Sequence, residues 1–80
     1  MRMVRNLTSS TIHFYEIDGG PSGIYWEGRV GDDGPYLGVF HYRQEIMEMA
    51  RILSLADHPI RFHTYSEWEM NSQLEEMLGG

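Results

Sequence analysis

The stretch from Arg43 to Ala56 constrains the fold most, because its apolar residues recur with the period of an α-helix. At about 100° per residue, one arc of the helical wheel is apolar and the other is mainly polar. The run contains no Gly or Pro and ends at His58-Pro59, since the residue before a proline is disfavoured in the α region. We therefore predict an amphipathic helix that covers a sheet. Its predicted inner arc is Ile46, Met49, Ala50, Ile52, Leu53 and Ala56, with Met47 and Leu55 outside it.

Four further stretches predict strands, because they are rich in β-branched and aromatic residues that alternate between two faces. Three precede the helix, at 11–17, 24–30 and 36–41, and are separated by turns rich in Gly, Asp and Pro. The fourth follows the helix at 59–65, and residues 2–7 are a weaker candidate for another strand. Short connections between the first three strands favour an antiparallel meander.

A second helix is predicted from Glu67 to about Leu78. Ser66 and Glu69 have the spacing of a capping box at its start. An apolar stripe follows, made of Met70, Leu74, Met77 and Leu78. The element order β-β-β-α-β-α predicts a single α+β domain over residues 1–80, with one mostly antiparallel sheet and two helices on one face.

Composition narrows the functional classes. The 80 residues include no cysteine, which excludes disulfides and thiolate metal sites. We see neither the apolar run of a signal peptide nor the roughly 18 apolar residues of a membrane span, and therefore expect a cytoplasmic protein. Twelve acidic residues face six arginines and no lysine, a net charge of −6. This surplus opposes direct contact with nucleic acid or anionic membranes and favours a basic partner surface, although it is also an ordinary charge for solubility.

No motif for chemistry is present. The chain has no Cys nucleophile and no Gly-x-Ser-x-Gly sequence. The glycine-rich turn at 19–23 lacks the Lys-Ser/Thr ending of a phosphate loop and leads into a predicted strand. The four histidines lie on different elements without metal-ligand spacing. We therefore predict no catalytic residue, no metal site and no cofactor.

The outer face of the predicted sheet displays aromatic and basic side chains. Alternation places Tyr25, Arg29, Arg61 and His63 on the face away from the helices. Open sheets with aromatic and arginine side chains stack RNA bases, so a sheet-face RNA or small-ligand module is one alternative. Glu27 shares this face and no basic arm accompanies it, which weighs against that alternative.

The second helix has the clearest acidic signal. Glu69 and Glu76 differ by about 20° on the helical wheel, and Glu75 flanks them beside Trp68, which lies off the apolar stripe. An exposed aromatic among carboxylates suits a basic groove, with the charges steering encounter; the alternative is a solvated helix whose Trp68 folds onto the sheet edge. Together with acidic residues of the first helix and a turn, the predicted partner-binding set is Asp32, Asp33, Glu45, Glu48, Trp68, Glu69, Glu75 and Glu76.

In size, acidity and architecture the chain resembles the small phage-encoded inhibitors of bacterial defence, anti-CRISPR proteins among them, some of which mimic DNA. The resemblance implies a non-catalytic inhibitor that blocks the basic nucleic-acid-binding surface of a partner such as a CRISPR effector complex, in the cytoplasm of a bacterial host. The charge would come from Glu45, Glu48, Glu69, Glu75 and Glu76.

The chain ends in Gly79-Gly80, as ubiquitin-like modifiers do. A modifier conjugated through Gly80 is therefore a further alternative. Gly79 also follows a predicted helix, where a glycine commonly serves as the C′ cap in a left-handed conformation.

Overall fold

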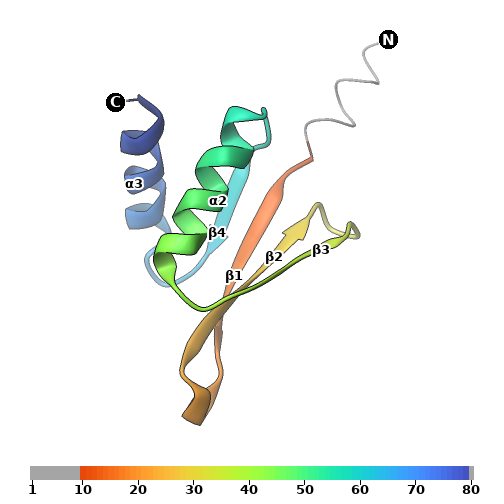
Figure 1. The fold of residues 1–80 in the computed structure, drawn as a ribbon, viewed down its shortest axis with the longest axis vertical. Coiled ribbons are helices and arrows are strands. Elements are labelled where there is room, and N and C mark those ends of the chain that lie inside the picture. The colour runs from red at the N-terminus through yellow and green to blue at the C-terminus, as the bar shows by residue number, and fades with distance from the viewer. Residues whose placement is uncertain (1–9, 80) are drawn as a thin grey trace.

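The computed structural model describes residues 10–79, which form a four-stranded sheet with two helices on one face (Figure 1). The α+β fold predicted from the element order is confirmed, and the predicted strand at 2–7 lies outside the described residues. The elements are β1 (Ile12–Asp18), a 3₁₀ turn η1 (Gly20–Ser22), β2 (Ile24–Val30), β3 (Tyr36–Phe40), α2 (Arg43–Leu55), β4 (Ile60–His63) and α3 (Glu67–Gly79).

The sheet has the strand order β3-β2-β1-β4. The first three strands form the predicted antiparallel meander, and α2 then crosses back so that β4 lies parallel to β1. The register places Phe14 of β1 beside Phe62 of β4 on one side and opposite Gly28 of β2 on the other. Since Gly28 has no side chain, the Phe14 ring occupies the space above it.

The core lies between the sheet and the two helices. Each element contributes apolar residues at its own period, two in the strands and about 3.6 in the helices. The rings of Phe14 and Phe62 stack at a centroid distance of 5.9 Å, and Phe40 meets Phe14 edge-on at 6.1 Å. The fully buried set is Ile12, Phe14, Ile46, Met47, Ala50, Phe62, Met70 and Leu74.

The buried arc of α2 differs from the predicted one. Met47, expected on the polar side, is only 2% exposed, whereas Ile52, expected in the core, is 51% exposed. The reason is lateral packing, because α3 lies beside α2 (Figure 1) and Met47 belongs to the same buried cluster as Met70 and Leu74 of α3. Ile52 consequently faces away from α3.

A side-chain hydrogen bond fixes the turn after β1. The backbone N–H of Gly20 donates to Asp18 Oδ1 at 2.9 Å.

Within residues 10–79 neither helix has the length and apolar character needed to cross a bilayer.

Candidate partner-binding surfaces

The outer face of α3 gathers four of the eight predicted partner-binding residues. Met70 and Leu74 anchor the helix in the core, so the side chains on the opposite arc point to solvent. Trp68 is 72% exposed and has not folded onto the sheet edge. Its companions on this arc are all exposed: Glu69, Glu75 and Glu76. We call these four residues the α3 acidic face.

One member of the α3 acidic face is tied to the neighbouring helix. Glu69 Oε1 lies 3.0 Å from Nη2 of Arg43 on α2. The carboxylate therefore pairs with α2 and does not form the capping box predicted with Ser66. Both side chains remain well exposed, so this ion pair contributes little to stability and leaves Glu69 open to another cation.

Glu75 and Glu76 lie toward the C-terminal end of α3, whose last turn has no basic residue. The helix dipole is negative at this end, so a carboxylate there costs about 0.3–1 kcal/mol at low salt. Their position does not favour the helix itself.

Glu45 and Glu48 lie on α2, and each already has a local partner. Glu45 Oε1 accepts the backbone N–H groups of His41 and Tyr42 at 3.3 and 3.2 Å, which caps the start of the helix. Glu48 Oε1 lies 2.6 Å from Arg51 Nη2, one turn along α2. Both glutamates border an apolar groove of about 540 Å³ beside the end of β3.

Asp32 and Asp33 lie in the turn between β2 and β3, apart from the helical glutamates. Figure 1 shows this turn at the right, with α3 at the left. Asp32 Oδ1 is 3.8 Å from His13 Nε2 at the edge of the open sheet face. The structure therefore separates the eight predicted residues into three groups: the α3 acidic face, the pair on α2 and the pair in the turn.

The open sheet face is built as the alternation predicts. The pairing of the strands puts Tyr25, Arg29, Arg61 and His63 on the face away from the helices. The two arginines are already engaged, since Arg29 lies 5.5 Å from the ring centre of Tyr36 and Arg61 Nε lies 3.5 Å from Glu67 Oε1. Both arginines are exposed, so these contacts leave them accessible, just as the Arg43 pair leaves Glu69 accessible.

The chain terminus differs from the prediction. Gly79 is the last residue of α3 and does not adopt the left-handed conformation of a C′ cap. A glycine in a right-handed helix costs up to about 1 kcal/mol relative to alanine, which the helix tolerates at its last residue. Gly80 lies outside the described residues.

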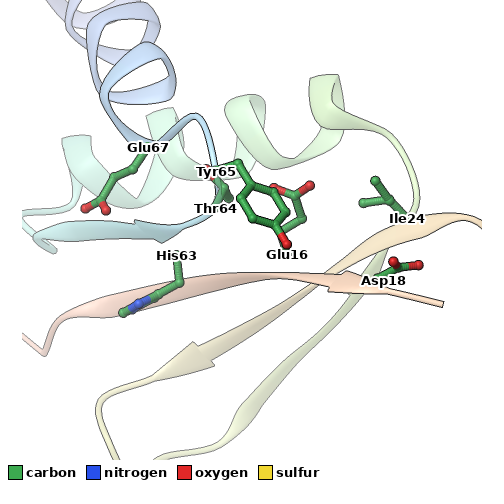
Figure 2. Close-up of a pocket in the computed structure, with 7 residues that line it drawn as sticks. All are labelled: Glu16, Asp18, Ile24, His63, Thr64, Tyr65 and Glu67. Carbon is green, nitrogen blue, oxygen red and sulfur yellow. The ribbon is translucent and has the colours of Figure 1, made fainter. Parts of the chain in front are cut away.

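A pocket that the sequence analysis missed lies where β4 ends beside the longer β1. Its volume is about 280 Å³, and Figure 2 shows carboxylates at both ends with the Tyr65 ring between them. The one sequence signal was Glu16, an acid on the strand face that also carries Ile12 and Phe14. The lining residues are Glu16, Asp18, Ile24, His63, Thr64, Tyr65 and Glu67.

Comparison with protein-family models, curated proteins and solved structures found no match.

The charge distribution therefore has to be interpreted from the residues themselves. Three of the twelve acidic residues, Glu48, Glu67 and Glu69, form ion pairs with arginines of residues 10–79. No group of three or more metal-ligating side chains occurs within the same residues. Most carboxylates of residues 10–79 therefore form no ion pair with an arginine of these residues. None of them belongs to a cluster suited to a metal ion.

Proposed function

We propose that the protein is a non-catalytic interaction protein that binds a basic surface of a protein partner through the α3 acidic face. The observation that carries the proposal is the 72% exposure of Trp68 among three exposed glutamates, on the side of α3 opposite its buried stripe. Tryptophan is the residue most enriched among interface hot spots. Carboxylates around such an anchor accelerate encounter with a basic surface and select against acidic partners.

The partner surface in this proposal is one that otherwise holds nucleic acid. A net charge of −6 on 80 residues gives a small body with a negative field, which is the property that a DNA-mimicking inhibitor uses. The protein would act stoichiometrically, as small anti-CRISPR proteins do, in the cytoplasm of a bacterial host. A CRISPR effector complex is one partner of this kind.

The alternatives are less well supported. Direct RNA binding on the sheet face would use Arg29 and Arg61, yet Glu27 shares that face and the net charge of −6 opposes contact with phosphates. Conjugation as a ubiquitin-like modifier uses an extended tail, whereas Gly79 belongs to α3. The interaction role needs no rearrangement of the described residues.

The test is capture of a partner from nuclease-treated bacterial lysate, identified by mass spectrometry and measured again with purified components. Two charge-reversed proteins are compared, Glu75→Lys with Glu76→Lys and Asp32→Lys with Asp33→Lys, which have the same net charge. We expect the first pair to abolish capture at low salt and the second to retain it. Equal loss in both variants, or capture that persists in the first, would contradict the proposal.

A further inference from the structure

A second surface lies on the side of α2 away from α3, where the apolar groove runs along the helix toward the end of β3. Phe40 at the end of β3 and Tyr42 just after it line the groove together with Met49 and Ile52 of α2. Tyr42 is 69% exposed and Ile52 is 51% exposed, while Phe40 and Met49 are half-buried. Single exposed apolar side chains are ordinary on a protein surface, but here two exposed and two half-buried apolar side chains line one groove of about 540 Å³.

The groove exists because the apolar arc of α2 is wider than its partners can cover. The sheet and α3 bury Ile46, Met47 and Ala50, and on another side the same helix has Met49, which packs on the edge of the core, and the exposed Ile52. Packing on the core explains Met49, but neither core packing nor helix formation explains the exposed Ile52, because polar residues such as Gln or Glu form helices as readily as Ile. The presence of Ile52 is consistent with contact with another apolar surface.

The rim of the groove has a defined charge. Glu45 and Glu48 border it, and no basic residue of 10–79 lines it. Each carboxylate has a local partner on one oxygen, yet a carboxylate accepts about four hydrogen bonds, so both retain capacity for a cation. An occupant that complements this groove carries apolar side chains on one face and lysine or arginine beside them.

We propose that the α2–β3 groove binds a basic amphipathic segment of a partner protein, with apolar side chains between Phe40 and Ile52 and cationic side chains beside Glu45 and Glu48. This is a helix-in-groove mode of recognition, in which the anchors repeat every three or four residues. The inference is independent of the α3 acidic face, which lies on the other side of α2.

The experiment titrates the full chain with two synthetic peptides of about three helical turns. One segregates Leu and Lys on opposite faces, and the other has the same composition with that segregation scrambled. Binding is followed by fluorescence anisotropy of the labelled peptide and by methyl NMR of the protein. We expect the segregated peptide to bind more tightly and to shift the Met49 and Ile52 methyl signals.

The key variant is Ile52→Gln, which keeps the side-chain size and the helix propensity but removes an apolar wall. Loss of this half-exposed side chain is expected to weaken the segregated peptide about fivefold. The matched control is Leu55→Gln, on the same helix and 64% exposed but outside the groove, and it is expected to leave binding unchanged. Equal effects of the two variants, or equal binding of both peptides, would overturn the proposal.

Two other occupants give different results. A second copy of the chain would appear as concentration-dependent dimerisation in sedimentation that Ile52→Gln abolishes. The chain's own first nine residues, which carry Arg2 and Arg5, would appear as peptide binding that requires their deletion. Either result would overturn the assignment to a partner segment. Neither result affects the proposal for the α3 acidic face, which the capture experiment with charge-reversed variants tests independently.

Discussion

The imidazole of His13 lies 2.9 Å from that of His63, measured from Nδ1 of the first ring to Nε2 of the second. In the parallel register of β1 and β4, His63 pairs with Tyr15 and His13 pairs with Arg61, so the two histidines are diagonal neighbours on one sheet face, and Tyr15 stacks on His63 at a centroid distance of 4.3 Å. A hydrogen bond between two imidazoles requires a neutral ring to accept it, because both nitrogens of an imidazolium are donors. The folded sheet therefore favours at least one neutral histidine.

The first prediction is a loss of stability in mild acid. Burial lowers the pKa of His63 below 6.5, and His13 and Arg61 lower it further, while Glu67 acts in the opposite direction. The unfolded chain therefore binds more protons than the folded one as pH falls through about 6.5, and the free energy of unfolding decreases in that range. Urea unfolding followed by circular dichroism between about pH 7.5 and pH 6 measures the slope.

The control for the histidine pair is His63→Gln, which removes the titrating group and keeps a polar side chain at the same place. We expect this variant to show a smaller pH slope than the parent over the same range. The substitution changes only this one position, so a residual slope is allowed. An unchanged slope would show that His63 does not contribute.

The second prediction concerns Gly28 in the middle of β2. A Cβ at this position would lie 3.1 Å from Phe14 Cε1 and 3.2 Å from Leu37 Cβ, next to a break in the register with β3. Gly28→Ala is therefore expected to destabilise the fold by about 1–2 kcal/mol, since the core must shift to admit the methyl group. The measurement is the midpoint of urea unfolding. In the Phe14→Leu background the same change should cost less, and strict additivity would contradict the proposed contact.

Most of the strands and helices could be located from the sequence, because their apolar residues recur with a clear period and Gly, Pro or polar turns flank them; the last strand is shorter than the predicted 59–65 and spans Ile60–His63. The helix wheel of α2 was less informative. It showed that an apolar arc exists, but it predicted Met47 to be exposed and Ile52 to be buried, and the structure has the reverse because α3 packs on one side of α2. Periodicity within an element does not state which neighbour covers its flank.

Among the candidate surfaces too, those within one element were predictable from the sequence and those formed between elements were not. The α3 acidic face was predictable because its residues lie on one short helix, where the spacing alone determines the arc. Asp32 and the helical glutamates lie on different elements, so only the tertiary structure determines whether they are close together. In the fold they are apart. The pocket beside Tyr65 joins Glu16 of β1 to Glu67 of α3, and no spacing in the chain relates these residues.

The third prediction separates stability from binding at Glu76. Removal of a negative charge from the last turn of α3 relieves its repulsion with the helix dipole, so Glu76→Gln should stabilise the protein by about 0.3–0.5 kcal/mol at low salt. The same variant is expected to weaken partner capture. Glu67→Gln serves as the opposite control, because it removes a carboxylate from the N-terminal turn and an ion pair with Arg61, and should destabilise. Loss of stability in Glu76→Gln would contradict the assignment.

The fourth prediction uses the two tryptophans as reporters. Trp26 is half-buried, and its Nε1 has neither solvent access nor a hydrogen-bond partner among the described residues, whereas Trp68 is 72% exposed. Acrylamide, which is uncharged and so insensitive to the acidic surface, should quench mainly Trp68. Trp68→Phe is expected to remove most of the quenchable emission while leaving the free energy of unfolding within about 0.5 kcal/mol, because an exposed side chain stabilises little. A bound partner should protect Trp68 from acrylamide and leave Trp26 unchanged. Quenching of Trp68 that is equal with and without a saturating partner would place the contact elsewhere on the surface and remove the α3 acidic face from the interface.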